Sequence, residues 1–245
     1  MEGTAEAQRI KQVFIRNSLT GQIRTRFAIK GVSVFALAFS PNDDLLAVST
    51  GNNFKLDPTN FGSVQLWNTR TGQLLPTSFS KGRQDCIIKS LAFSPDGRIL
   101  AGGGGDEVIR LWNTKGGPVT RYLYQRDFPA ILHYSADGSR LMVAGNNSIK
   151  VWQVPTSHVI FARKTDDYPY DFDSTLSPDG RKCDFNGSVW NCDTGRKIGD
   201  FLTPNPSVWS KDSRTVTALD QTEEPFKGGR AANPDGPHLL YVLGS

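Results

Sequence analysis

A short serine-centred motif recurs along the chain and constrains its fold more than any other feature of the 245 residues. The motif follows an apolar run and places its serine at Ser40, Ser94, Ser135, Ser177 and Ser210, in the stretches LAFSP, LAFSP, LHYSADG, STLSPDG and SVWSKDS. Successive serines are 54, 41, 42 and 33 residues apart. Units of about 40 residues that each hold four short strands are typical of β-propeller blades.

A second, tryptophan-centred motif agrees with the first. It reads LWN, LWN, VWQ and VWN, and it places its tryptophan at Trp67, Trp112, Trp152 and Trp190, with spacings of 45, 40 and 38 residues. In each unit an apolar strand ends at the serine, a second strand follows, a third ends at the tryptophan, and a turn rich in Asn, Thr and Gly returns the chain as a fourth. Residues 13–27 fit the second half of such a unit, with Arg16 in the place of the tryptophan, so we expect the chain to begin midway through a blade.

Four consecutive glycines at residues 102–105 raise the question of a phosphate-binding loop. Such a loop follows a strand and opens a helix, with a Lys-Ser or Lys-Thr pair placed to reach phosphate and metal. Here an alternating run from Val108 to Trp112 follows instead, which predicts a strand. The glycines are therefore expected to form one side of a hairpin and to allow close approach of neighbouring chain.

On these motifs, the chain resembles the tryptophan-aspartate (WD) repeat family of β-propellers over residues 10–220. The resemblance implies an all-β fold of four-stranded blades, either five blades or an incomplete larger ring. It assigns structural roles to Trp67, Asp106, Trp112, Trp152 and Trp190. The family's hydrogen-bonded tetrad of Asp, His, Ser or Thr, and Trp is reduced to Asp106 and Trp112 in the second blade. We therefore expect blades that are held mainly by apolar packing.

Closure of the ring depends on the ends of the chain. The half-blade at residues 10–28 could be completed by strands near residues 207–210 and 215–219, which would give five blades and remove an exposed sheet edge. A fragment, or a chain completed by a partner, stays open as an alternative. Residues 221–245 are polar and rich in Gly and Pro and are predicted to be a flexible tail, whose end, PHLLYVLG, could form one more strand.

The distribution of charged and apolar residues argues against nucleic-acid binding and against a membrane span. The 28 Lys and Arg are interspersed with 24 Asp and Glu, which gives no nucleic-acid-binding stripe. No run of eighteen apolar residues and no signal-peptide pattern is present, so we expect a cytoplasmic or nuclear protein without a membrane span. Cys86, Cys183 and Cys192 are predicted to be free thiols, since a hairpin turn at residues 186–187 places the last two diagonally, roughly 7 to 8 Å apart.

The sequence holds no recognisable catalytic or metal-binding arrangement, so neither an enzyme nor a cofactor is predicted. His133 and His158 fall in expected strands and His238 in the tail, and all three are assigned structural or exposed roles. A small-molecule ligand is not predicted either.

Loops between blades, and between the second and third strands of a blade, are expected to gather on one face. Aromatic and basic side chains are concentrated there, and we predict that a protein or peptide partner binds to Phe54, Lys55, Phe61, Arg83, Tyr124, Arg126, Tyr168 and Tyr170. Aromatic residues together with arginine have the composition of binding hot spots. The alternative is that these aromatics pin their own loops and that the longest loop, residues 50–62, is a tolerated surface insertion.

Three functions follow as hypotheses. The first is a non-catalytic scaffold that binds proteins or peptides through this loop face. The second is a propeller enzyme with a carboxylate-bound metal at the central channel, for which only Asp106 is plausibly placed. The third is a sensing or regulatory region derived from a larger signalling protein.

Overall fold

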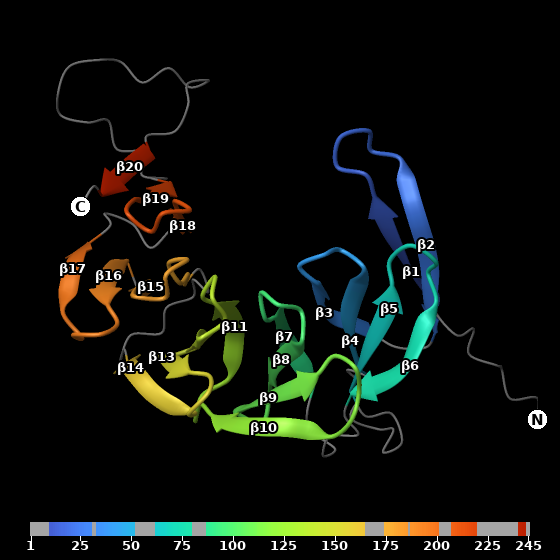
Figure 1. The fold of residues 1–245 in the computed structure, drawn as a ribbon, viewed down its shortest axis with the longest axis horizontal. Coiled ribbons are helices and arrows are strands. Elements are labelled where there is room, and N and C mark those ends of the chain that lie inside the picture. The colour runs from blue at the N-terminus through green and yellow to red at the C-terminus, as the bar shows by residue number, and fades with distance from the viewer. Residues whose placement is uncertain are drawn as a thin grey trace, which may run out of the picture. The chain divides into compact units, whose positions relative to one another are not determined.

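The computed structural model describes residues 10–30, 33–51, 62–79, 87–164, 174–185, 187–200, 207–219 and 240–243. Within these residues the regular elements are twenty β-strands, which form six antiparallel sheets (Figure 1). The chain divides into two compact units, Met1–Leu132 and His133–Ser245. The predicted all-β fold with four-stranded sheets is confirmed.

The first unit opens with a two-stranded sheet of β1 (Ile10–Arg16) and β2 (Ile23–Lys30). In the turn between them, Asn17 Oδ1 accepts hydrogen bonds from the backbone amides of Leu19 and Thr20, both at 2.9 Å. Asn68 Oδ1 makes the same pair of bonds, also at 2.9 Å, in the turn between the third and fourth strands of the next sheet. The hairpin therefore has the geometry of the last two strands of a unit.

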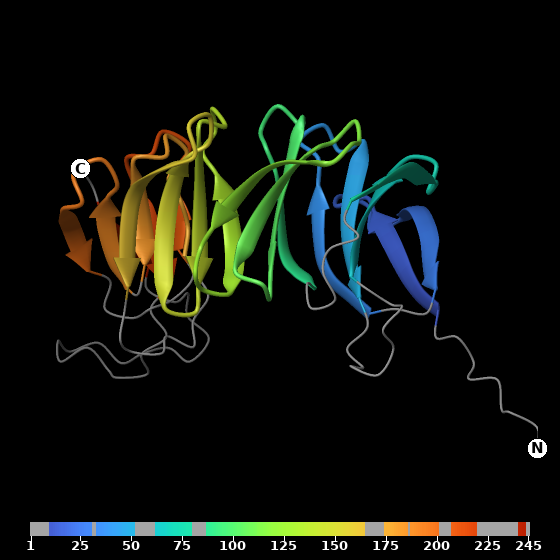
Figure 2. The same cartoon turned by 90° about the horizontal axis from the view of Figure 1, so that it is seen from below.

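Two complete four-stranded sheets follow, each a meander in which strands pair in chain order. The first consists of β3 (Ser33–Phe39), β4 (Leu45–Gly51), β5 (Ser63–Asn68) and β6 (Leu74–Phe79). The second consists of β7 (Ile88–Phe93), β8 (Ile99–Gly104), β9 (Val108–Asn113) and β10 (Val119–Tyr124). Because the strands are antiparallel, the β7–β8 and β9–β10 turns lie at one end of the sheet and the β8–β9 turn at the other (Figure 2). We call these the serine-turn end and the loop end.

The remaining strands form one four-stranded and two three-stranded sheets. The four-stranded sheet consists of β11 (Pro129–Tyr134), β12 (Arg140–Gly145), β13 (Ser148–Gln153) and β14 (His158–Lys164). The next consists of β15 (Lys182–Phe185), β16 (Ser188–Asn191) and β17 (Lys197–Asp200). The last consists of β18 (Ser207–Trp209), β19 (Val216–Leu219) and β20 (Leu240–Leu243).

The fourth repeat differs from the complete unit that its sequence predicts. Of its expected first strand, the part that the structure describes, from Ser174 onward, forms an isolated bridge between Leu176 and Cys183. The Asp184 carboxylate accepts hydrogen bonds from both the amide and the hydroxyl of Thr175, at 2.5 and 2.8 Å. Past the bridge, the Asp184 amide still donates to the carbonyl oxygen of Thr175 at 3.1 Å. The Asp184 side chain takes up the Thr175 amide, which a regular ladder would pair with a main-chain carbonyl.

Strand pairing at the two ends of the chain is separate. β1 pairs with β2, whereas β18 and β19 lie in a sheet with β20. The expected completion of the first half-blade by β18 and β19 is not among these pairs, and closure of a five-bladed ring stays a prediction.

One aromatic contact recurs between neighbouring sheets within each unit. A phenylalanine on the last strand of one sheet packs against the tryptophan on the second-from-last strand of the next sheet. The pairs are Phe27–Trp67, Phe79–Trp112 and Phe161–Trp190, with ring centroids 4.2, 5.8 and 6.2 Å apart. Aromatic pairs at such distances stabilise a core beyond the area they bury. This agrees with the expectation that apolar packing holds the blades.

The polar tetrad suggested by the family resemblance does not form in the second blade. Trp112 is only 1% exposed, and its indole Nε1 has no hydrogen-bond partner. Asp106 is instead paired with Arg110, two residues before the tryptophan. The structural role of Trp112 is therefore apolar, and that of Asp106 is to neutralise a buried guanidinium.

The glycine run is a site of close packing, as the sequence predicts. A Cβ atom on Gly102 would lie 2.5 Å from Cζ3 of Trp112, and one on Gly103 would lie 2.8 Å from the ring of Pro129. A Cβ atom on Gly104 would collide with the carbonyl oxygen of Ile87. Residues 102–104 belong to β8, so no phosphate-binding loop is formed.

Candidate partner-binding site

Two loops meet at the loop end of the second blade. The β8–β9 turn contains Glu107, and the connection that follows β10 begins with Gln125. The backbone amide of Gln125 donates a hydrogen bond to the carbonyl oxygen of Glu107 at 3.0 Å. The Gln125 residue is 1% exposed, so it anchors the connection in the protein interior. The residues that follow are thereby held in a fixed position relative to the sheet.

Arg126 has an unusual backbone conformation. Its φ angle is 61°, in the left-handed region that non-glycine residues adopt at a cost of roughly 1 kcal/mol or more. The residue is exposed, so the cost is not repaid by burial of its side chain. Backbone strain of this kind is concentrated at functional positions.

Two exposed aromatic residues flank Arg126 in the sequence. Tyr124 at the end of β10 is 64% exposed and Phe128 is 45% exposed. The Asp127 carboxylate between them accepts a hydrogen bond from the Phe128 amide at 2.8 Å, which helps to fix the chain ahead of β11. We call Tyr124, Arg126 and Phe128 the blade-two loop surface. Its combination of two aromatic rings and a guanidinium has the composition of a protein-binding hot spot.

A charge pair joins the β8–β9 turn to strand β9. Arg110 of β9 donates two hydrogen bonds to the Asp106 carboxylate, one of them from Nη1 at 3.0 Å. The two side chains are 9% and 22% exposed. Removing one partner from such a pair leaves an uncompensated charge with little access to water. The pair therefore stabilises the β8–β9 turn, and the Asp106 carboxylate already has its counter-charge.

The structure places only part of the predicted binding set. Tyr124 is the last residue of β10 and Arg126 lies in the connection that follows it, and both are exposed, as predicted. The other six lie outside the described residues, and their role stays a prediction: Phe54, Lys55, Phe61, Arg83, Tyr168 and Tyr170. The four tryptophans assigned structural roles all lie in the expected strands, with Trp152 in β13.

Sequence reasoning did not single out Gln125 or Glu107. A polar residue in a connecting loop gives no signal that it is buried, because its burial depends on a contact with a turn eighteen residues earlier in the chain. The positive φ angle of Glu107, 62°, could not be predicted from the sequence either, because glutamate rarely adopts such an angle.

His133 and His158 lie in strands β11 and β14, as the sequence predicts, and His238 lies outside the described residues. Cys183 and Cys192 are free and buried, and Cys86 lies outside the described residues. A hydrogen bond with the Cys192 thiol and burial raise the pKa of the Cys183 thiol well above its ordinary value, so it stays protonated at neutral pH.

Two further findings concern the part of the chain that the structure describes. It contains no group of three or more His, Cys, Asp or Glu side chains arranged to hold a metal ion. It also contains no helix long and apolar enough to cross a membrane.

Comparison with known proteins shows which family and which proteins the chain is similar to. Residues 75–113 match the family described as "WD domain, G-beta repeat". The WD repeat-containing protein 91 homolog of Dictyostelium discoideum is 30% identical over 163 residues, which span 64% of this chain and 20% of that protein. The small ribosomal subunit protein RACK1z of Oryza sativa subsp. japonica is 34% identical over 76 residues, 30% of this chain and 22% of that protein.

A third relative is the p21-activated protein kinase-interacting protein 1-like protein of Xenopus laevis, 26% identical over 110 residues, which span 45% of this chain and 30% of that protein. The matched stretches therefore cover less than a third of each of these three proteins. The repeated antiparallel sheets define a β-repeat protein whose four-stranded units are consistent with propeller blades. Residues 75–113 match the WD40-repeat family, and the chain is similar over longer stretches to proteins that carry such repeats.

Proposed function

We propose that this chain is a non-catalytic interaction scaffold that binds a protein or peptide partner through the loop end of its blades. The observation that carries the proposal is the blade-two loop surface, where Tyr124 and Phe128 are 64% and 45% exposed on either side of the exposed Arg126. Large exposed aromatic groups next to an arginine are costly to leave in water and are enriched where partners bind.

The anchoring of this surface supports binding by a rigid site. Gln125 is buried, and its amide is bonded to Glu107, so the backbone between Tyr124 and Arg126 is ordered before a partner arrives. A preorganised loop loses less conformational entropy on binding than a mobile one. The chemistry fits a partner that offers an acidic side chain to Arg126 and apolar groups to Tyr124 and Phe128.

The names of two relatives are in keeping with the proposal. One relative is named as interacting with a protein kinase, and another is named as a protein of the small ribosomal subunit. Both names describe association with other macromolecules. The partner of this chain is to be identified by the experiment that tests the proposal.

The remaining residues of the predicted loop face extend the same proposal. Phe54, Lys55 and Phe61 belong to the loop after β4, and Tyr168 and Tyr170 to the segment after β14. Arg83 belongs to the segment after β6. In a meander, each of these connections leaves the same end of its own sheet as the connection after β10 leaves its sheet, which is where loops that carry function are expected.

The proposal is tested by photo-crosslinking in a native lysate, with the full chain carrying p-benzoylphenylalanine in place of Phe128. The matched control carries the same group in place of Ile198, which is 52% exposed on β17. The proposal expects one or a few proteins joined to position 128 and absent from position 198. Equal patterns at the two positions, or no adduct at position 128, would contradict it.

A further inference from the structure

Cationic side chains connect successive serine turns in the second unit. Arg140, five residues after Ser135, donates a hydrogen bond from Nη1 to the carbonyl oxygen of Gly180 at 3.0 Å. Lys182, five residues after Ser177, donates from Nζ to the carbonyl oxygen of Ser213 at 3.1 Å. Gly180 and Ser213 each lie three residues after the serine of their own turn. The same two positions of the repeat therefore make the same contact twice.

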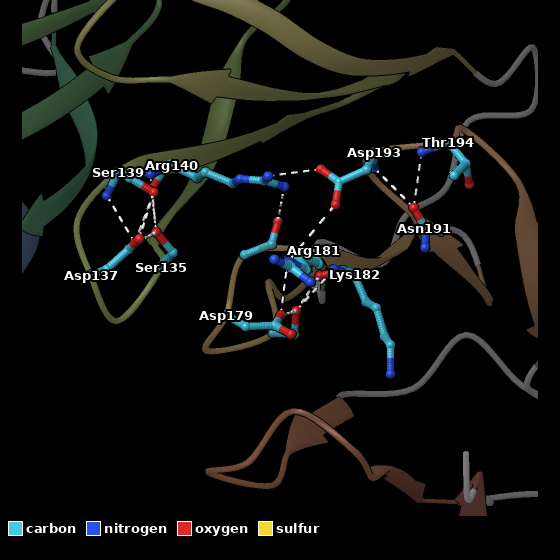
Figure 3. A network of polar contacts seen from close by, with 12 residues as sticks. Ser135, Asp137, Ser139, Arg140, Asp179, Arg181, Lys182, Asn191, Asp193 and Thr194 are labelled. Atoms are coloured by element: carbon cyan, nitrogen blue, oxygen red, sulfur yellow. Dashed lines mark hydrogen bonds and ion pairs between the residues drawn. The ribbon is translucent and has the colours of Figure 1, made fainter.

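Arg140 also contacts a carboxylate, in addition to the carbonyl oxygen of Gly180. Nη2 of Arg140 lies 2.7 Å from Oδ1 of Asp193, and Figure 3 shows the side chain extended from its own turn toward Asp193 and Arg181. The Arg140 side chain is 19% exposed. One planar guanidinium thus binds a backbone carbonyl and a carboxylate together, which the fork geometry of arginine permits.

The first unit has a hollow at the corresponding place. Leu45 stands five residues after Ser40, where Arg140 stands after Ser135, and Gly97 stands three residues after Ser94. Leucine has no group that can donate to the Gly97 carbonyl. Between the two turns lies a hollow of about 290 Å³, lined by residues of both, Leu45 and Gly97 among them. Its volume is that of several water molecules at about 30 Å³ each, which is room for a guanidinium group.

The hollow is also acidic. Asp96 lines it, and its Oδ1 accepts hydrogen bonds from Ser94 Oγ at 2.6 Å and from the Arg98 amide at 3.0 Å. These bonds hold the pKa of Asp96 below its ordinary value, so the carboxylate is ionised at neutral pH. Its Oδ2 lies 3.9 Å from Nε of Arg98, too far for a hydrogen bond, and the Arg98 side chain is 81% exposed. One carboxylate oxygen is therefore available to a ligand.

We propose that this hollow binds an arginine side chain of a partner protein, whose guanidinium donates to the Gly97 carbonyl and pairs with Asp96. The Gly97 oxygen already accepts a bond from Thr114 Oγ1 at 2.9 Å and, like any carbonyl, has a second lone pair. The proposal goes beyond the loop-end function, because the hollow is at the serine-turn end of the sheets. It does not depend on the blade-two loop surface.

The residue that corresponds to Asp193 is a lysine in the first unit. Lys115 stands two residues after Asn113, as Asp193 stands two residues after Asn191. The carboxylate that pairs with a bound guanidinium is therefore supplied by Asp96 of the serine turn. It also follows that Lys115→Asp, which restores the pattern of Asp193, should strengthen binding.

The test is a titration of the ¹⁵N-labelled full chain with the peptide acetyl-Gly-Arg-Gly-amide, followed by NMR chemical shifts. The control peptide carries citrulline, which has nearly the same shape as arginine and no charge. The proposal expects saturable shifts at the amides of Asn42, Asp96 and Gly97 with the arginine peptide, at least fivefold larger than with citrulline. Equal shifts with the two peptides, or none at these amides, would overturn it.

Variants separate this site from general electrostatic attraction. Leu45→Arg should fill the hollow from within and abolish the shifts, and Asp96→Asn should weaken binding at least fivefold. Asp137→Asn is the matched control, because Asp137 holds the same place in the turn of the third repeat. Loss of binding in Asp137→Asn, or full binding in both hollow variants, would overturn the proposal. Substitution of Tyr124 and Arg126 should leave the titration unchanged, so the outcome is independent of the loop-end function.

Discussion

The phenyl ring of Phe27 stacks on the indole ring of Trp67, with centroids 4.2 Å apart and an angle of 13° between the planes. This contact joins the β1–β2 hairpin to the first four-stranded sheet. A polar contact supports it, because Thr25 Oγ1 donates to the carbonyl oxygen of Thr69 at 2.6 Å. An isolated two-stranded hairpin is at best marginally stable, so the hairpin depends on these contacts.

Replacement of Phe27 by alanine should destabilise the first unit. The side chain is buried, and the loss of a buried phenylalanine costs about 3 to 5 kcal/mol. Urea unfolding followed by tryptophan fluorescence measures the change. Phe14→Ala is the control on the same hairpin, since Phe14 is 45% exposed and its loss should cost less than about 1 kcal/mol. Equal costs for the two variants would contradict a stabilising stack.

Removing one partner of the Asp106–Arg110 pair should lower the free energy of unfolding strongly, whereas replacing both partners by apolar residues should lower it little. Asp106→Ala leaves the 7%-exposed Arg110 without its counter-charge and should lower the free energy of unfolding by about 3 kcal/mol. The double substitution Asp106→Leu with Arg110→Met should recover most of that loss. The double-mutant cycle is measured by chemical unfolding, and additive losses would show that the two side chains do not act as a pair.

The serine turns should make stability depend on pH in the acid range. The hydrogen bond from Ser94 holds the pKa of Asp96 below its ordinary value of 3.8 in the folded chain. A carboxyl whose folded pKa is lowered contributes stability that is present above the unfolded pKa and is lost as the pH falls through the folded pKa. Ser94→Ala should therefore raise the pKa of Asp96 toward 3.8.

A ¹³C NMR titration of the Asp96 carboxyl carbon measures this pKa. Asp137 in the same variant is the internal control, because its own bond to Ser135 is intact and keeps its pKa low. An unchanged pKa for Asp96 would show that the serine does not control its ionisation.

The strained backbone of Arg126 gives a prediction that separates binding from folding. Arg126→Gly removes the left-handed strain and should leave the protein at least as stable as the wild type, with a gain of up to about 1 kcal/mol. The same change removes the guanidinium from the blade-two loop surface and should weaken partner binding. Thermal unfolding measures the first effect, and a clear loss of stability would show that the arginine has a structural role.

The repeated sheets could be predicted because their signals are local. The serine turns and the tryptophan strands recur in the same order in successive repeats, and the structure places Trp67, Trp112, Trp152 and Trp190 in equivalent strands. The packing role of residues 102–104 could be predicted for the same reason, since a run of glycines before a strand indicates close approach.

Features that depend on long-range contacts could not be predicted. The Asp184 side chain accepts a hydrogen bond from the amide of Thr175, nine residues earlier, and nothing in its type signals that bond. Gln125 is buried because it meets the β8–β9 turn. The hollow beside Gly97 becomes visible only when Leu45 is compared with Arg140, whose contact to the next turn is known from the structure.

The central claim is tested most directly by the affinity for the partner that photo-crosslinking at position 128 identifies. Isothermal titration calorimetry with that purified partner compares the wild type, Tyr124→Ser with Arg126→Gly, and the control Arg196→Ala with Ile198→Ser. The control pair matches the first in exposure and in loss of one arginine and one large apolar group. The account predicts binding at least about tenfold weaker in the loop variant, as expected for hot-spot residues, and within twofold of wild type in the control. Equal affinities for the loop variant and the wild type would contradict it.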